Sequence, residues 1–344
     1  MLVKRRFSQS VRGRATGENP ARKMCAASQL YFRPMATLIC GSMAYDTIMV
    51  FPDHFKNHIL PEQIHILNVS FMVPEMRREF GGTAGNIGYN MKLLGEEPAI
   101  MATVGHDFTP YRERLERLGL RATHVRELHD QFTAQAFITT DMADNQITAF
   151  HPGAMSFAHL NRIPDAPDAT LGIVSPDGRQ GMVEHCRDFA AAGIPYVFDP
   201  GQGLPMFSGD DLEHLMDGAA ALTVNDYEAR VVEQKTGRST ERIAEKLGAV
   251  IVTRGAEGSS VYTREGRIDV AAAKAERVID PTGCGDAFRA GLLYGMARRW
   301  EWRRSARLAS VMGAIKIAHR GGQNHRPSRE QIAATLRETF DETL

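Results

Sequence analysis

Short apolar runs, each ended by glycine or a polar residue, recur along the chain and predict the strands of a buried sheet. In the second half these runs lie at 171–174, 196–198, 221–224 and 250–253. Helical patterns separate them, as at 181–192 and 239–247. Because alternating strands and helices build a parallel sheet with helices on both faces, the pattern predicts a doubly wound α/β domain.

The first half begins with a similar strand at 36–41, and another is expected at 98–104. Between them, the segment 65–73 places mostly apolar side chains on one face at period two, which predicts a strand with one covered side. That face carries His65, Leu67, Val69, Phe71 and Val73. A glycine-rich start at residue 81 leads into a helix that Gly95 closes.

Further β-prone runs lie at 47–51, 134–140 and 146–150. The polar stretch 141–145 joins the last two, which predicts a hairpin. We expect the segments near 47–80 and 133–153 to form a small sheet that covers a site on the main domain as a lid.

Polar residues follow three of the predicted strands directly. Asp199 follows 196–198, Asn225 follows 221–224, and Arg254 with Gly255 follows 250–253. Ligands of open parallel sheets bind beyond the carboxyl ends of the strands. The sequence therefore predicts a binding site at this edge.

Composition excludes several classes of function. Lys+Arg and Asp+Glu both number 41, so the chain has no basic field for nucleic acid. No stretch approaches the roughly 18 uninterrupted apolar residues of a membrane-spanning helix. The four cysteines are scattered, without zinc or disulfide spacing, and we expect a reducing, cytoplasmic setting.

The first residues differ from the rest of the chain. Segment 1–34 carries eight basic side chains against one acid, Glu18. Such a composition can mark an organelle transit peptide; a disordered tail, or a start at Met35, are the alternatives. We expect 35–335 to form the folded domain and 336–344 a C-terminal tail.

The segment Asp280–Phe288 carries the strongest chemical signal. Gly283 and Gly285 permit a tight turn, and a helix is expected to follow. Backbone N–H groups at such a helix start bind phosphate well. Asp286, ionised at neutral pH, could remove a proton from an alcohol beside that phosphate. An aspartate that only caps the helix is the alternative.

A second glycine-rich segment, 81–86, precedes the helix that Gly95 closes. It is not a Walker A sequence, because no Gly-Lys-Ser/Thr follows, and it lacks the G-x-G-x-x-G spacing of a dinucleotide site. Either glycine segment alone would be weak evidence. A nicotinamide oxidoreductase is disfavoured because that fingerprint is missing.

Together, segments 81–86 and 280–288 resemble the two signatures of the ribokinase (PfkB-type carbohydrate and nucleoside kinase) family. The resemblance covers about 35–332. It implies a ribokinase-like fold, a mostly parallel sheet with a small β-sheet lid, and phosphorylation of a hydroxyl group by ATP with Mg²⁺. The chain departs from the family at Gly88, where Ser, Thr or Ala is usual, and at Cys284, where Ala or Gly is usual.

The resemblance also assigns roles residue by residue. Asp286 is then the catalytic base, with an anion hole at Gly283, Cys284 and Gly285. Substrate binding falls to Asp46, Gly81, Gly82, Asn86 and Gln202. ATP binding falls to Asn225, Thr253, Gly255 and Gly258, and Glu228 would hold Mg²⁺ through water. A solvated loop glutamine and a helix-surface glutamate are the alternatives for Gln202 and Glu228.

Within the family, the stretches 150–154, 198–205 and 224–229 look closest to bacterial adenosine or broad-specificity nucleoside kinases. The expected reaction is phosphorylation of the 5′-hydroxyl of a purine ribonucleoside. A sugar kinase acting on ribose, fructose or a keto-sugar acid is the first alternative. A catalytically silent nucleoside-binding or regulatory protein is the second. The resemblance further allows activation by a monovalent cation such as K⁺, and either a monomer or a lid-mediated homodimer.

Overall fold

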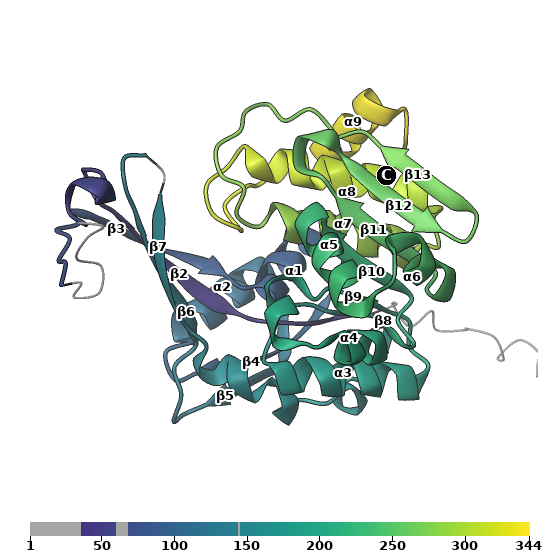
Figure 1. Cartoon of the computed structure of the whole chain (residues 1–344), viewed down its shortest axis with the longest axis horizontal. Coiled ribbons are helices and arrows are strands. Elements are labelled where there is room, and N and C mark those ends of the chain that lie inside the picture. Colours follow the sequence, from purple (N-terminus) through teal and green to yellow (C-terminus); the bar gives the residue numbers. More distant parts are fainter. Residues whose placement is uncertain (1–35, 60–67, 144) are drawn as a thin grey trace, which may run out of the picture. The chain divides into compact units, whose positions relative to one another are not determined.

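The computed structural model describes residues 36–59, 68–143 and 145–344. Their main element is a nine-stranded sheet of order β13-β12-β11-β10-β9-β8-β1-β4-β5 (Figure 1). Its strands are β1 (Ala36–Cys40), β4 (Ala99–Gly105), β5 (Arg121–Leu128), β8 (Ala169–Val174), β9 (Tyr196–Phe198), β10 (Ala221–Asn225), β11 (Ala249–Thr253), β12 (Ser259–Thr263) and β13 (Gly266–Val270). In the order of the sheet, the strands β11, β10, β9, β8, β1, β4 and β5 run parallel to one another. At its other edge, β12 pairs antiparallel with β11 and with β13. The predicted doubly wound, mostly parallel sheet is confirmed.

Helices cover the large sheet on both faces, because neighbouring residues of a strand point to opposite sides. Ile39 of β1 packs in one buried cluster, and Leu38 and Cys40 pack in another. The first cluster includes α1 (Thr83–Leu93), α2 (Thr109–Leu118), α7 (Cys284–Ala297) and α8 (Trp302–Ile317). The second includes α3 (Arg179–Ala192), α4 (Gly209–Met216), α5 (Asp226–Thr236) and α6 (Thr240–Lys246).

The order of the strands reverses between β1 and β8. Ligands of such sheets bind outside the carboxyl ends of the strands beside this switch. The backbone there is closely packed. A side chain at Gly41 would bring its Cβ within 2.1 Å of the Ser175 hydroxyl oxygen and 2.7 Å of the Thr83 hydroxyl oxygen. The loop after β1 and the start of α1 are therefore held against the loop after β8.

A second sheet of four strands has the order β3-β2-β6-β7 and corresponds to the predicted lid (Figure 1). Its strands are β2 (Ala44–Val50), β3 (Glu75–Gly81), β6 (Ala134–Thr140) and β7 (Gln146–His151). The predicted hairpin is confirmed as β6 and β7, which pair antiparallel. The predicted strand at 47–51 is also present, but it begins three residues earlier, at Ala44.

The predicted strand at 65–73 is wrong for 68–73, which belong to no strand; 65–67 lie outside the described residues. The antiparallel partner of β2 is β3, whose charged sequence gives no clear apolar face. The alternation at 69, 71 and 73 still reflects real packing. Phe71 lies against Phe51 and Phe55, with ring centroids 4.8 and 5.0 Å apart.

The C-terminal boundary predicted at residue 335 is too early. Helix α9 (Arg329–Phe340) continues past it, and Leu336 has no exposed surface. Leu336 packs with Ile332 and with Leu308 of α8 in a third buried cluster. The predicted N-terminal tail, 1–34, lies outside the described residues.

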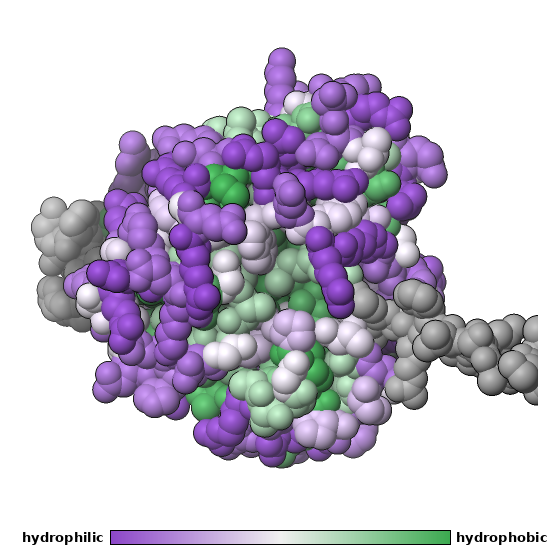
Figure 2. Space-filling model, turned by 90° about the vertical axis from the view of Figure 1, so that its right-hand side faces the viewer, coloured by the Kyte–Doolittle hydropathy of each residue, from purple (hydrophilic) through white to green (hydrophobic). Residues whose placement is uncertain are grey.

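No helix in the described ranges is long and apolar enough to cross a membrane. Figure 2 shows one face of the molecule, with hydrophilic residues over much of its rim and more apolar residues towards its middle. Single exposed apolar residues of this kind are normal on a protein surface.

Candidate active site

Asp286 lies in the first turn of α7, and not before it as the sequence pattern suggested. The helix begins at Cys284, and Gly283 precedes it with a φ of 77°, a conformation that favours glycine. The Cys284 N–H donates to the carbonyl of Pro281 at 3.1 Å. The amides of Gly285 and Asp286 have no acceptor within the helix, since they belong to its first turn. They are therefore able to donate to an anion beside the Asp286 carboxylate, and we call residues 280–286 the anion-binding turn after this predicted role.

The Asp286 carboxyl group has the environment of a base that works near neutral pH. Burial raises its pKa to about 6, although the Asn86 hydrogen bond and the nearby Arg289 guanidinium act to lower it. The Asn86 amide nitrogen donates to Oδ2 of Asp286 at 2.8 Å. This contact brings the two glycine-rich segments of the sequence to one point.

A chain of hydrogen bonds fixes the orientation of Asn86. Gln323 donates from its amide nitrogen to Oδ1 of Asn86 at 3.1 Å and to the Tyr111 hydroxyl at 2.6 Å. Tyr111 in turn donates to the carbonyl of Gly81 at 2.8 Å. Since Oδ1 is an acceptor, the nitrogen of Asn86 must face Asp286. Sequence reasoning missed Gln323 and Tyr111, because nothing local marks either.

Asp46 lies on the lid, in β2, and faces the same site. In the strand register it lies beside Glu79 of β3 and Ala136 of β6. Burial, and after it the charges of Glu79 and Asp280, raise its pKa to about 6. A Cβ on Gly81 would approach Oδ2 of Asp46 to 2.5 Å, so the absence of a side chain at Gly81 leaves room for this carboxylate.

The other signature glycines have distinct structural reasons. Gly82 caps α1 with a φ of 84°, and a Cβ there would lie 2.5–2.6 Å from backbone atoms of residues 42–44. A Cβ on Gly88 would lie 2.8 Å from Cδ1 of Ile100. The Ile100 side chain therefore takes the space that a larger residue would need, which explains the departure at Gly88.

A buried ion pair supports the site from behind. The Arg289 guanidinium makes two hydrogen bonds to the Asp199 carboxylate, from Nε to Oδ2 and from Nη2 to Oδ1, the latter at 2.7 Å. Asp199 follows β9 at the predicted edge and is 1% exposed. Arg289 is 7% exposed and was missed, although an arginine in an otherwise apolar helix three residues after Asp286 was a readable signal.

On the predicted nucleotide side, Asn225 and Glu228 form a mutual cap at the start of α5. Oδ1 of Asn225 accepts the N–H of Glu228 at 2.8 Å, and Oε2 of Glu228 accepts the N–H of Asn225 at 2.8 Å. Capping alone would explain the spacing of these two residues. Burial also raises the pKa of Glu228, and the charges of Asp199 and Arg289 act on it, so it lies near the ion pair.

The remaining predicted residues lie in two loops at the same sheet edge. Thr253 ends β11, and Gly255 and Gly258 flank the following turn with φ of 55° and 91°. A Cβ on Gly258 would come within 2.1 Å of the Val270 carbonyl. Gln202 is exposed in the turn after β9, so a contact with substrate stays a prediction.

No cluster of three or more His, Cys, Asp or Glu side chains in the described part of the chain could hold a metal ion. Mg²⁺ bound with its nucleotide keeps several waters and takes few protein ligands, so one carboxylate can serve it. Glu228 fits such a role as one carboxylate near the anion-binding turn.

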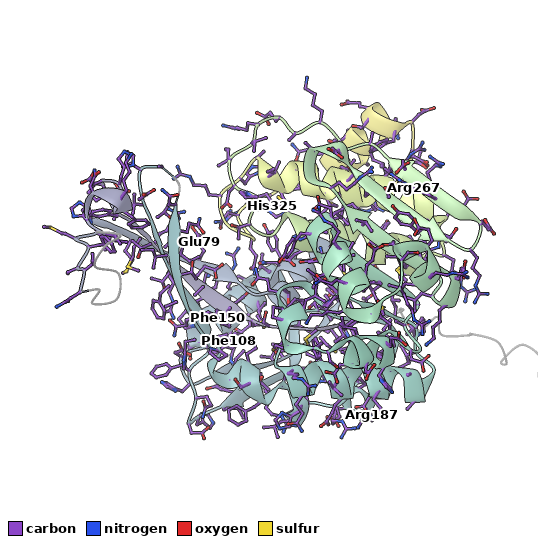
Figure 3. All side chains as sticks on the ribbon, in the orientation of Figure 1. Glu79, Phe108, Phe150, Arg187, Arg267 and His325 are labelled. Carbon is purple, nitrogen blue, oxygen red and sulfur yellow. The ribbon has the colours of Figure 1, made fainter. Side chains whose placement is uncertain are left out.

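The lid carries an aromatic side chain on the face of Asp46. Phe150 of β7 pairs with Ala136, and Ala136 pairs with Asp46, so the three share one face. Figure 3 shows Phe150 and Glu79 on the small sheet, with His325 on the part of the core towards the lid. Phe150 is 52% exposed and therefore free to contact a ligand.

The comparisons with known proteins agree with this site. A sequence model described as the pfkB family of carbohydrate kinases matches residues 43–329. A nucleoside kinase of Methanocaldococcus jannaschii is 28% identical over 271 residues, 78% of this chain and 89% of its own.

Two solved structures are more similar. The nucleoside kinase of Burkholderia thailandensis in complex with inosine is 52% identical, with a TM-score of 0.82 over 90% of this chain and 99% of that one. The same enzyme in complex with ADP-inosine is 53% identical, with a TM-score of 0.80 over 90% and 97%.

Proposed function

The chain belongs to the pfkB family of carbohydrate kinases and is an ATP-dependent kinase, and from this premise we propose that it phosphorylates the 5′-hydroxyl of a purine ribonucleoside. The observation that carries the proposal is the pairing of two carboxylates in one site. Asp286 stands at the anion-binding turn, and Asp46 faces it from the lid, close enough that the charge of Asp46 helps to raise the pKa of Asp286.

The two carboxylates suit different tasks. An ionised Asp46 offers two acceptor oxygens, which match two neighbouring hydroxyls of a ribose. Asp286, with its pKa raised to about 6, can accept the proton of a third hydroxyl at neutral pH. A ribose held by Asp46 would thus present its free primary hydroxyl to Asp286.

The surroundings of Asp286 favour transfer of a charged phosphoryl group. The free amides of Gly285 and Asp286 and the positive end of α7 stabilise negative charge beside the base. Arg289, held by Asp199, adds a buried positive charge behind them. Positioning and charge stabilisation of this kind are the main sources of catalysis in phosphoryl transfer.

We assign the binding of Mg²⁺, through water, to Glu228. The ion would neutralise charge on the ATP phosphates. Glu228 is held by the N–H of Asn225, so its carboxylate keeps a fixed direction. The Asn225 cap and the turn 255–258 border the same edge, where the ATP phosphates would lie.

A nucleoside substrate, rather than a free sugar, is favoured by the apolar residues that share the face of Asp46. Phe150, Ile48 and Ile138 lie on this face, and a purine base could pack against them. A free sugar would leave this surface open to water. The Burkholderia thailandensis enzyme, whose structure contains inosine, supports the same choice.

The opposite face of the lid also carries apolar residues. Met76, Phe137 and Ile147 are 70%, 40% and 44% exposed there. A lid-mediated homodimer would cover them, and it stays a prediction.

The test is ADP release by the purified protein with Mg·ATP and a panel of adenosine, inosine, guanosine, cytidine, ribose and fructose. We expect turnover with purine nucleosides and little with free sugars. 5′-Deoxyadenosine is the matched control, because it keeps the base and both ring hydroxyls but lacks the accepting group. Turnover only with a free sugar would contradict a nucleoside substrate. Phosphorylation of 5′-deoxyadenosine would contradict transfer to the 5′-hydroxyl. A silent binding protein would bind nucleosides but release no ADP.

A further inference from the structure

Lys316 is the one buried lysine among those that the structure describes, and it has no exposed surface. It lies in the last turn of α8, directly behind the segment that leads to Asp286. Lysine is almost never fully buried unless it is paired, because removing its charge from water is costly. Its position therefore needs an explanation.

The Lys316 ammonium bridges two loops. Nζ donates to the carbonyl of Asp280 at 2.7 Å and to the carbonyl of His319 at 3.0 Å. Both acceptors are backbone groups, so no side-chain carboxylate in the described residues neutralises the ammonium at hydrogen-bond distance. Its positive charge acts on the carboxylate of Asp280 and on the anion-binding turn, because Cys284, Asp280 and Asp286 are the groups whose charges act on it.

The Asp280 side chain joins the same two loops. Its Oδ1 accepts the N–H of Thr282 at 2.8 Å, and its Oδ2 accepts the N–H of Gly321 at 2.8 Å. The N–H groups of Ile279 and Asp280 donate to the carbonyl of Ile317, at 2.9 and 3.2 Å. The anion-binding turn is therefore fixed to the end of α8, with a positive charge at the junction.

We propose that Lys316 is a positioning residue that holds the anion-binding turn and supplies a permanent positive charge there. This charge balances the negative charge of the transferred phosphoryl group, so that turnover needs no K⁺. This disagrees with the activation by a monovalent cation that the sequence allowed. A K⁺ ion would need carbonyl oxygens of this kind, and two that converge behind the turn already accept from an ammonium. The inference rests on the proposed kinase activity.

The first experiment uses the unaltered protein. ADP release with Mg·ATP and inosine is measured in buffers whose monovalent cation is K⁺, Na⁺ or choline alone. We expect the rates to agree within about twofold, because the ammonium cannot dissociate. A loss of about tenfold or more in choline, restored by K⁺, would overturn the proposal.

The second experiment removes the charge with Lys316→Met. We expect kcat in choline to fall about tenfold or more, because the methionine carries no charge. In Lys316→Ala, whose short side chain leaves the ammonium position open, K⁺ or NH₄⁺ should restore part of the rate. The KM for inosine should change little, since Lys316 lies behind the turn. A purely structural lysine would lower the unfolding temperature without making the rate depend on the cation, and that result would overturn the proposal.

Lys235→Met is the matched control. Lys235 also donates to two backbone carbonyls, those of Leu204 at 2.9 Å and Phe207 at 2.5 Å, but it lies on α5, outside the anion-binding turn. Its loss should create no dependence on K⁺.

Calorimetric titration with ADP in choline and in K⁺ separates the proposed role of Lys316 from the proposed nucleoside kinase activity. Weaker binding by Lys316→Ala in choline, restored by K⁺, would support this role of Lys316 even if inosine proved not to be the substrate. Equal ADP binding by both proteins in both salts would count against it.

Discussion

The side-chain amide of Asn86 donates a 2.8 Å hydrogen bond to Oδ2 of Asp286, although the two residues are 200 positions apart in the chain. Each lies at the start of a helix that follows a glycine-rich turn. A side chain at Gly322 would bring its Cβ within 2.5 Å of Oδ1 of Asn86, so the loop behind the amide is also closely packed. The carboxylate proposed as the base is therefore oriented by the segment that we propose forms the substrate side of the site.

Asp286→Asn tests the base. We expect kcat to fall about 10²–10⁴-fold, because the amide cannot accept the proton of the substrate hydroxyl. Inosine should still bind, since Asp46 and the lid are unchanged. ADP release and calorimetric titration with inosine measure the two effects. The control is Asp210→Asn, an exposed aspartate on α4 that is expected to change neither.

The same variant makes a prediction about stability. The pKa of Asp286 is raised in the folded protein, to about 6, so its ionisation above that pH opposes folding. Asp286→Asn should therefore unfold at a higher temperature than the unaltered protein at pH 8. The difference should shrink as pH falls below 6 and disappear near pH 4, where the carboxyl is protonated in both states. Thermal unfolding, followed by circular dichroism at each pH, measures this difference. A lower unfolding temperature for Asp286→Asn than for the unaltered protein at pH 8 would contradict the prediction.

The activity should fall as the solution becomes acidic. The pKa values of Asp286 and Asp46 are both raised to about 6, mainly by burial, and each residue works only when ionised. We expect kcat/KM to be constant near pH 8 and to decline below about pH 6, where both carboxyls take up protons. The log plot should be steeper than for one group. In Asp46→Asn the slope should drop towards that of a single group; an unchanged slope would show that Asp46 does not titrate in this range.

Asp46→Asn should act mainly on substrate binding. A hydrogen bond to a charged group contributes about 1.5–3 kcal/mol, so losing the carboxylate should raise the KM for inosine by about 10- to 100-fold. Asp286 remains, and kcat should fall much less. 2′-Deoxyinosine provides a second test, because it lacks one of the two hydroxyls. It should bind more weakly than inosine to the unaltered protein, and the difference should largely vanish in Asp46→Asn.

Arg289→Met breaks the buried pair with Asp199. It leaves the Asp199 carboxylate buried without its partner, so we expect a loss of about 3–5 kcal/mol in the free energy of unfolding. The guanidinium also holds down the pKa of Asp286, so the acidic limit of kcat should move to higher pH. Asp199→Asn combined with Arg289→Met should recover part of the stability and move the pH limit part of the way back, because the charge of Asp199 raises the pKa of Asp286. If the pH at which kcat falls were unchanged in Arg289→Met, the Arg289–Asp199 ion pair would serve the stability of the fold alone.

Gly81→Ala tests the close approach of the lid strand to Asp46. The added Cβ would lie 2.5 Å from Oδ2 of Asp46, so the carboxylate must move. We expect a higher KM for inosine with a fold that is otherwise intact. Gly313→Ala is the control, because a Cβ on this helical glycine would meet its nearest neighbour, the Cys284 carbonyl, at an ordinary 3.7 Å. Equal KM values for Gly81→Ala and the unaltered protein would remove the steric argument.

Local patterns were sufficient for the regular part of the fold. The strands β8, β9, β10 and β11 were each predicted within two residues, because buried strands between helices leave short apolar runs. Glycines at 82 and 283 could be recognised as special, since both adopt positive φ at a helix start. The hairpin of β6 and β7 followed from its polar turn.

Elements without a local signal were missed. Strand β3 was not predicted, because most of its side chains are partly or fully exposed and its sequence is charged. The pairing of Arg289 with Asp199 spans 90 positions, and that of Gln323 with Asn86 spans 237. No period or spacing in the sequence reports contacts of this length.

The sequence by itself therefore determined the type of domain, the two glycine-rich turns and the choice of Asp286 as the candidate base, because each depends on residues that are neighbours in the chain. Tertiary structure decided how these parts act together. The reversal of strand order between β1 and β8 brings the start of α1 beside the start of α7, and only there does Asn86 meet Asp286. Packing also buries Asp286, Lys316 and Arg289, and burial raises the pKa of the Asp286 carboxyl, since desolvation is a property of the packed molecule and not of the chain.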